Sequence, residues 1–336
     1  MRSNVNKISI LQRVRNMERW QINLATLWIT QVISLTSFGF GLPFIPYYIQ
    51  ELGVNDPVTL NLYTGLLSAA PAITMAFMSP IWGILSDRFG QKLMIQRAML
   101  AAFFIIGGMG FAQAIWHLVA LRLLQGVFTG TITASSTFVA VNTPNNKLSF
   151  ALGFLSSSTF IGYSLGPWLG GMVAEQFGYR TSFWVGAFIM LFGFLLVTLF
   201  LKSSQPLTAA SAVQGTELVK AQGAEPSALP PSEKKLLSVI TYAISLMLLM
   251  LFFHRILRTV FTPFIPLYVQ EMTGTKVGAA SLTGSINGLV GFVTALSAVL
   301  ISRLGDRYPK LTLIKVMLLI AFAVSIGLNF VDSLML

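Results

Sequence analysis

Long apolar runs, each close to the length needed to cross a lipid bilayer, follow one another along most of the chain. A transmembrane helix needs about 20 consecutive residues of mainly apolar character. Short polar or glycine- and proline-containing breaks separate the runs. The pattern predicts nine membrane-spanning helices, at 20–49, 60–84, 93–113, 117–141, 148–174, 181–201, 237–269, 277–301 and 311–331.

The predicted helices fall into a group of six and a group of three, divided by a polar segment. Residues 202–236 are rich in Ala, Ser, Gln and Pro. Such a segment is too polar to span a bilayer and too poor in large apolar groups to fold alone. The expected organisation is a six-helix transmembrane bundle at 1–201, a flexible cytoplasmic linker at 202–236, and an incomplete transmembrane bundle at 237–336.

A ten-residue sequence occurs twice, once near the start of each group. Residues 42–51 read LPFIPYYIQE and residues 262–271 read TPFIPLYVQE. Each copy closes a long apolar helix, so the chain contains an internal duplication. Duplicated helical bundles that face each other across a cavity are a common architecture of secondary transporters. The prediction gives three helices in the second bundle and six in the first.

Composition supports an all-α polytopic membrane protein: 54% of the residues are hydrophobic, 10% are charged, and the mean hydropathy is +0.74. No cysteine is present, which excludes disulfides and thiolate metal sites. His117 and His254 are the two histidines and cannot form a metal cluster. The sequence contains no Walker lysine, paired catalytic carboxylates or Ser/His/Asp set, so we expect neither an enzyme nor a cofactor, and transport energy would come from an ion gradient.

The net charge of +11 raises the question of nucleic-acid binding, and the distribution of the charge answers it. If the helices alternate in direction, most of the 22 Lys and Arg residues fall on one side, and the opposite loops hold only Arg180 and Lys276. This asymmetry is the positive-inside pattern of membrane proteins. It predicts a multi-pass protein of the cell membrane, with the N terminus and the linker in the cytoplasm and no nucleic-acid partner.

A charged loop joins the second and third predicted helices and reads GILSDRFGQKL from residue 83. Glycines allow a tight reversal, an aspartate can face the positive end of a helix, and basic side chains can bind phosphate or carboxylate groups. An ordinary charged loop would also have this composition. The loop resembles the signature G-x-x-x-D-R-x-G-R-K of the major facilitator superfamily, with Gln91 in place of the first basic residue of the R-K pair. The matching residues are Gly83, Asp87, Arg88, Gly90 and Lys92.

In that family the loop is thought to latch the two halves together in the outward-open state. The resemblance implies this role for Asp87, against a helix that would lie beyond residue 336. A degenerate copy occupies residues 302–310, where Asp306 and Arg307 stand in the places of Asp87 and Arg88. We expect Asp306 to face the start of the fifth helix near residues 145–147, where unpaired helix amides favour an anion.

Arg122 lies within apolar sequence in the fourth predicted helix. An arginine inside a membrane is costly and normally faces protein or water, which makes it a functional candidate. The surrounding sequence resembles the R-x-x-Q-G signature of the same family, which implies a role in proton coupling. The alternative is that Arg122 reaches the nearby interface, or only binds backbone carbonyls.

The fifth predicted helix contains the sequence GYSLGPWLGG from residue 162. Glycines four residues apart share a helix face and allow close approach of another helix, and a proline bends the helix. Packing alone would account for all of these residues. The sequence resembles the pattern G-x-x-x-G-P-x-x-G-G, which in this superfamily is associated with drug-exporting antiporters. The residues concerned are Gly162, Gly166, Pro167, Gly170 and Gly171.

Two sets of side chains are candidates for a substrate cavity. Gln31 and Phe38 lie in the first predicted helix, and His254, Arg255 and Arg258 lie in the seventh. The first helix has no acid in its apolar run, although several family members use one there. Helix contacts would also explain the first set. The two arginines could receive an anionic substrate or balance an acid from another helix.

The leading hypothesis is a secondary transporter of the drug:proton antiporter branch, which exports drugs or other amphipathic small molecules in exchange for protons by alternating access. One alternative is an exporter of a sugar or anionic metabolite. Another is a truncated, non-transporting remnant, or a chain that needs a partner to supply further helices.

Overall fold

The computed structural model describes residues 18–202, 245, 248–250, 252–253, 261–275, 278–305, 312, 315–317, 319–320 and 322–324. Within these residues the regular structure is helical and contains no strand. This agrees with the predicted all-α fold. The predicted linker lies outside the described residues from position 203 onward, so the proposed domain boundaries stay predictions.

The first half forms six spans in the predicted order. Five spans are long and apolar enough to cross a membrane: Arg19–Glu51, Pro57–Phe89, Gln91–Gly110, Ile115–Asn142 and Tyr179–Phe200. The span before the last is a 30-residue helix, Leu148–Phe177. The helices are α2 (Arg19–Gly41), α3 (Ile45–Glu51), α4 (Pro57–Phe89), α5 (Gln91–Gly110), α6 (Ile115–Phe128), α7 (Thr131–Asn142), α8 (Leu148–Phe177) and α9 (Tyr179–Phe200). The described part of the second half contains α12 (Ile265–Thr273) and α13 (Ala279–Gly305).

The sequence pattern predicted one uninterrupted helix for the first span, but the structure shows two helical segments. A short 3-10 turn at Leu42–Phe44 separates α2 from α3. The second copy of the repeat has the same turn at Thr262–Phe264, directly before α12. Each copy contains two prolines, and a proline both lacks an N–H and crowds the carbonyl four residues earlier. The duplication seen in the sequence is therefore also a duplication of backbone conformation.

The fourth span is also interrupted, between α6 and α7. Gly130 has φ +142° at the break, a conformation that only glycine adopts readily. The Thr129 hydroxyl donates a hydrogen bond to the carbonyl oxygen of Gln125 at 2.6 Å, which satisfies one acceptor at the end of α6. The span predicted at 117–141 is confirmed as Ile115–Asn142, but it consists of two helical segments, because one glycine ends the first.

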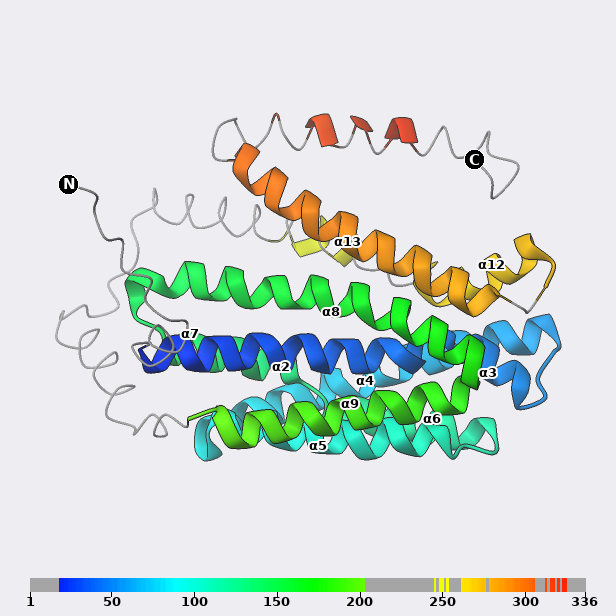
Figure 1. Cartoon of the computed structure of the whole chain (residues 1–336), viewed down its shortest axis with the longest axis horizontal. Helices are drawn as coiled ribbons and strands as arrows, with labels where there is room; N and C mark the ends of the chain where they lie inside the picture. Colours follow the sequence, from blue (N-terminus) through cyan, green and yellow to red (C-terminus); the bar gives the residue numbers. More distant parts are fainter. Residues whose placement is uncertain are drawn as a thin grey trace, which may run out of the picture.

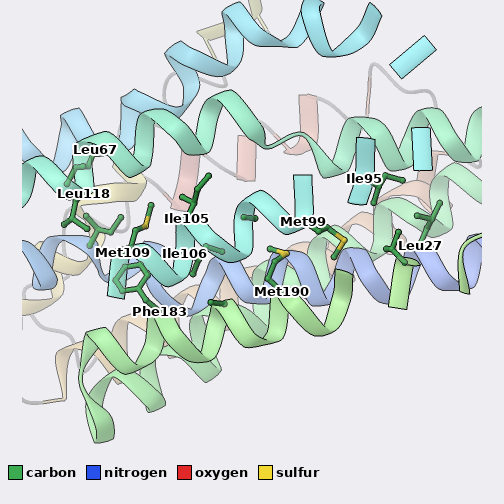
Figure 2. Packing of buried hydrophobic residues seen from close by; sticks show 14 of the residues in the cluster. Leu27, Leu67, Ile95, Met99, Ile105, Ile106, Met109, Leu118, Phe183 and Met190 are labelled. Carbon is green, nitrogen blue, oxygen red and sulfur yellow. The ribbon is translucent and has the colours of Figure 1, made fainter. Parts of the chain in front are cut away.

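Helix α2 lies at the centre of the first half, between α8 and α9 (Figure 1). Large side chains fill the space between α2, α5 and α9, as Figure 2 shows, and Leu27, Met190 and Phe183 are fully buried there. Lipid tails are as apolar as these side chains, so close packing rather than exclusion from water holds such a bundle together.

The two ends of the bundle differ in charge. One end, named here the basic end, carries five basic residues at helix termini, beside the acids Glu18 and Asp87: Arg19, Arg88, Lys92, Lys147 and Lys202. The opposite end, named the acidic end, carries four acids, beside Arg180: Glu51, Asp56, Glu175 and Glu271. Helix α13 lies against α8 toward the acidic end and diverges from it toward the basic end (Figure 1).

Candidate functional site

The two copies of the repeat contact each other at the acidic end. The Tyr47 hydroxyl on α3 donates to the carbonyl oxygen of Pro266 at 2.5 Å and lies 3.1 Å from the Thr283 hydroxyl on α13. Gln50 donates through Nε2 to Oε1 of Gln270 at 3.0 Å. Tyr47 and Thr283 are almost completely buried. These polar contacts join the first half to the second.

A carboxylate completes this junction. Glu175, in the last turn of α8, accepts hydrogen bonds from the backbone N–H of Gly278 at 2.5 Å and of Ser281 at 3.4 Å. These amides belong to the start of α13, where backbone donors lack helical partners and the helix dipole is positive. Glu175 also lines a cavity of about 340 Å³ together with Glu51 and Tyr179. Its side chain is exposed.

The glycines of α8 pack closely on α2. A Cβ atom added to Gly166 would lie 2.7 Å from the Cα of Gly39, and one added to Gly170 would lie 2.5 Å from the Cα of Phe40. Real Cβ atoms almost never approach other atoms so closely, and the neighbouring atoms here are backbone. Gly162 meets the same helix one turn away. This glycine face therefore sets the distance between the two helices.

A second face of α8 packs on α13. A Cβ atom added to Gly284 would lie 3.2 Å from the Cα of Gly171 and closer still to the carbonyl oxygen of Pro167. The Ser164 hydroxyl donates to the carbonyl oxygen of Gly288 at 2.6 Å. The segment predicted as an antiporter motif thus touches both halves of the protein. These contacts run from the middle of α8 toward its end at the acidic side.

Arg122 is buried within the bundle. Its side chain is 8% exposed, and Nη1 donates to Oε1 of Gln125 at 3.0 Å. Its Nε atom is buried and has no hydrogen-bond partner among the described residues. This burial disfavours the alternative in which Arg122 reaches the interface. The neighbouring Gly126 lies tightly against Pro71 of α4, so it serves packing.

One face of α2 carries buried polar groups without partners. Gln31 and Ser34 are almost fully buried, and Gln31 Nε2 and Ser34 Oγ have no hydrogen-bond partner among the described residues. Phe38 is half-buried and, at helical spacing, shares their face. An unpaired buried polar atom is costly, which makes this face a candidate position for an ordered water or a polar ligand.

The charged loop lies beside a cavity at the basic end. Asp87, in the last turn of α4, lines a space of about 200 Å³ together with Gly83, Trp82 and Arg97. The guanidinium carbon of Arg97 lies 3.2 Å from the centroid of the Trp82 ring. Arg97 Nε and Nη1 are buried and have no hydrogen-bond partner among the described residues. The sequence indicated the loop but did not single out Arg97 as part of a site.

The remaining residues of the predicted loop are accounted for locally. Arg88 is exposed, Gly90 has φ +85° at the junction of α4 and α5, and Lys92 donates to the carbonyl oxygen of Thr198 at 3.3 Å. Several other predicted site residues lie outside the described residues: His254, Arg255, Arg258, Asp306 and Arg307.

Comparison with known proteins shows which family the chain belongs to. Residues 27–335 match the Major Facilitator Superfamily. The chain belongs to the major facilitator superfamily. It is 32% identical over 315 residues to a protein of Lactococcus lactis named multi-drug resistance efflux pump PmrA homolog, and the match covers 94% of this chain and 74% of that protein.

Further relatives agree with this assignment. The chain is 31% identical over 315 residues to the multidrug resistance protein MdtG of Salmonella arizonae, again covering 94% of this chain and 74% of that protein. A crystal structure of a D-xylose-proton symporter aligns with a TM-score of 0.64, at 16% identity, covering 85% of this chain and 69% of that one. The human organic anion transporter MFSD10 aligns with a TM-score of 0.60, at 17% identity, covering 83% and 71%. These two structures show the shared fold.

As a major facilitator protein, the chain is a multi-pass transporter of the cell membrane that handles small molecules. Of the groups that join its halves, Tyr47, Thr283 and Glu175 were missed in the sequence. Gln50 and Gln270 stand in the repeat itself, and comparison of the two copies could have found them. Glu175 carried a weaker signal, as an acid at the end of a helix opposite the basic side.

Proposed function

We propose that this transporter exports drugs or other amphipathic small molecules in exchange for protons, by alternating access. The observation that carries the proposal is the position of the α8 glycine segment, which packs on α2 through one face and on α13 through another. A closely packed helix that touches both halves can transmit a change in one to the other. The names of the relatives from Lactococcus and Salmonella support multidrug export as the activity.

The described helices correspond to one state of such a cycle. Hydrogen bonds and close glycine contacts join the halves at the acidic end, whereas α8 and α13 diverge toward the basic end (Figure 1). The positive-inside rule supports assigning the basic end to the cytoplasm, together with the N terminus and the linker. On that assignment this state admits substrate from the cytoplasm, and export requires the acidic end to open.

Individual residues take roles consistent with this cycle. The buried, incompletely paired Arg122 is proposed for proton coupling, and Gln31 with Phe38 is proposed to line the substrate path. The loop of Asp87 is proposed to latch the halves in the opposite state, when the basic end closes. The roles of Asp306, Arg307, His254, Arg255 and Arg258 rest on the sequence alone.

Dye accumulation in cells tests the export function. Cells that express the chain should accumulate less of a fluorescent lipophilic cation than control cells, and a protonophore should abolish the difference. Surface labelling and immunoblotting must show that the protein is present in the membrane. Unchanged accumulation in cells with well-expressed protein would contradict the proposal, and a difference that survives the protonophore would contradict proton coupling.

A further inference from the structure

Exchange for protons requires an acidic or basic group whose protonation alters a gate. The described acids are Glu18, Glu51, Asp56, Asp87, Glu175 and Glu271. Each lies at or beyond a helix terminus rather than in the middle of a span. In other transporters an acid in the middle of the membrane can bind the proton. Among the described residues, the candidates for this role are therefore carboxylates at the ends of the bundle.

Glu175 differs from the other described acids in what it binds. Its two oxygens accept hydrogen bonds from Gly278 N and Ser281 N, so this carboxylate connects α8 of the first half to the start of α13 of the second. Asp56, by comparison, accepts bonds from Thr59 in its own helix. A change in the charge of Glu175 acts directly on the contact between the halves.

We propose that Glu175 is the proton-binding group of the acidic-end gate. When ionised, it offers acceptors to unpaired amides and a negative charge to the positive end of the helix dipole. When protonated, it loses the charge and one acceptor site. Charge-assisted hydrogen bonds are roughly twice as strong as neutral ones, so binding of a proton weakens this contact. This inference rests on the proposed export function, in which Arg122 is proposed for proton coupling, and names the group through which protons from the solution open the acidic end.

The surroundings of Glu175 suit this role. Glu51 and Tyr47 of α3 and Tyr179 of α9 line the same cavity. Arg180 of α9 interacts electrostatically with Glu51. Helix α13 has no charged residue before Arg303, and Lys276 precedes it in the sequence outside the described residues.

The exposure of Glu175 to solution and the direction of proton entry are also consistent with this role. The Glu175 side chain is exposed, so protons from the solution at the acidic end reach it without crossing the bundle. If that end faces outward, protons driven inward arrive first at this carboxylate. Protonation then loosens the contact between the halves, the acidic end opens, and substrate leaves. Return to the closed state requires that the Glu175 carboxyl release its proton to the solution at the acidic end, so this group controls the gate and does not itself carry the proton across the membrane.

Distance measurements on the purified chain test the proposal, because the protein has no native cysteine. Spin labels at Val58→Cys and Met272→Cys, two exposed positions near the acidic end in different halves, report the opening of that end. In lipid nanodiscs without substrate, we expect the ratio of open to closed populations to rise about threefold as the pH falls from about 7 to about 4, which brackets the ordinary range of glutamate titration near about 4.3.

Two variants decide whether Glu175 is responsible. Glu175→Gln should make the label distances independent of pH, whether its neutral amide leaves the gate more open or still holds it closed. Glu51→Gln, an acid of the same cavity with no bond to α13, should keep the wild-type response. The proposal would be overturned if the pH response persisted in Glu175→Gln or were absent from the wild type. It would also be overturned if the response were lost in Glu51→Gln alone.

The outcome separates this inference from the export function. Export of dye by a protein whose acidic end does not respond to pH would remove Glu175 as the proton site and leave the exporter intact. A pH response centred on Glu175 in a chain that exports nothing would support the proton site and contradict the proposed function.

Discussion

Gln50 and Gln270 occupy the same position in the two copies of the repeat, and they hydrogen-bond to each other at 3.0 Å. Equivalent residues of a duplicated unit meet only where the axis that relates the units passes between them. In this superfamily that axis runs along the membrane normal. The glutamine pair therefore marks the point at which the pseudo-two-fold axis leaves the bundle at the acidic end.

The first prediction concerns this glutamine pair. The double variant Gln50→Cys with Gln270→Cys should be bridged readily by a short bifunctional methanethiosulfonate reagent, because the glutamine side chains meet at their tips and no other cysteine competes. The crosslink should abolish transport, and a reducing agent should restore it. Gel mobility and dye export measure the two effects.

The pair Gln50→Cys with Leu289→Cys serves as the control and should not crosslink, because Leu289 is 64% exposed on α13. Equal crosslinking of both pairs would show that the halves are not arranged as described.

The second prediction concerns the contact between α8 and α2. Gly166→Ala should lower the free energy of unfolding by about 1–3 kcal/mol, because the new methyl group meets backbone atoms that cannot move aside. Gly153→Ala is a matched control in the same helix, since nothing lies within 4 Å of its added Cβ. Thermal unfolding of both variants in detergent compares them. Equal melting temperatures for the two variants would mean that the glycine face does not set the helix spacing.

The third prediction concerns the contact between α8 and α13. Gly284→Ala should force the two helices apart, because its added Cβ would meet the Pro167 carbonyl. We expect a shift toward the state that is open at the acidic end, seen as slower crosslinking between Gln50→Cys and Gln270→Cys. Leu289→Ala, on the exposed side of α13, should leave the crosslinking rate unchanged. A faster rate in Gly284→Ala would count against a closed junction held by this contact.

The fourth prediction concerns Arg122 and its acceptor. Gln125→Ala removes the hydrogen bond to a buried guanidinium and should lower the free energy of unfolding by about 1–3 kcal/mol. Arg122→Gln should remove proton-driven export while leaving the protein folded, since it replaces the buried charge with a neutral polar group. Arg122→Lys keeps the charge and separates a requirement for charge from one for geometry. Dye export with and without a protonophore, beside thermal unfolding, gives both readouts. Full proton-driven export by Arg122→Gln would exclude Arg122 from coupling.

The fifth prediction concerns pH and the start of α4. Asp56 accepts hydrogen bonds from the backbone N–H and the hydroxyl of Thr59, which hold the pKa of its carboxyl below the ordinary value. The folded protein therefore favours the ionised form, and this stabilisation is present at neutral pH and is lost as the pH falls through the lowered pKa. Asp56→Ala should reduce the melting temperature at pH 7, with little difference from wild type in strong acid. An equal difference at both pH values would show that the capping charge is not the cause.

Much of the fold was readable from the sequence because hydrophobic runs of membrane length leave few alternatives. The six spans of the first half, and the pairing of the two halves, follow from such runs and from the repeated LPFIPYYIQE sequence. The breaks at Leu42–Phe44 and Gly130 were missed, because hydropathy is the same on both sides of each break and the signal lies in prolines and in one backbone angle.

The site was less accessible to sequence reasoning. Motifs pointed to the α8 glycines and to Arg122, whose close contacts the structure describes. Contacts between distant segments leave no local pattern in the sequence. The hydrogen bond that Gly278 N–H donates to Glu175 is an example, because it joins residues 103 positions apart. The contact between Trp82 and Arg97 depends in the same way on how α4 and α5 come together, which no spacing within one helix reveals.

The break at Gly130 has a mechanical consequence. Nothing lies within 4 Å of a Cβ added to this glycine, so no neighbouring side chain imposes the bend there. Helix α6 packs on α4 and α5, whereas α7 packs on α5 and α2, so the two segments of this span have partly different neighbours. A shift of the segment that holds Arg122 therefore need not be passed along this span to the segment that reaches the basic end.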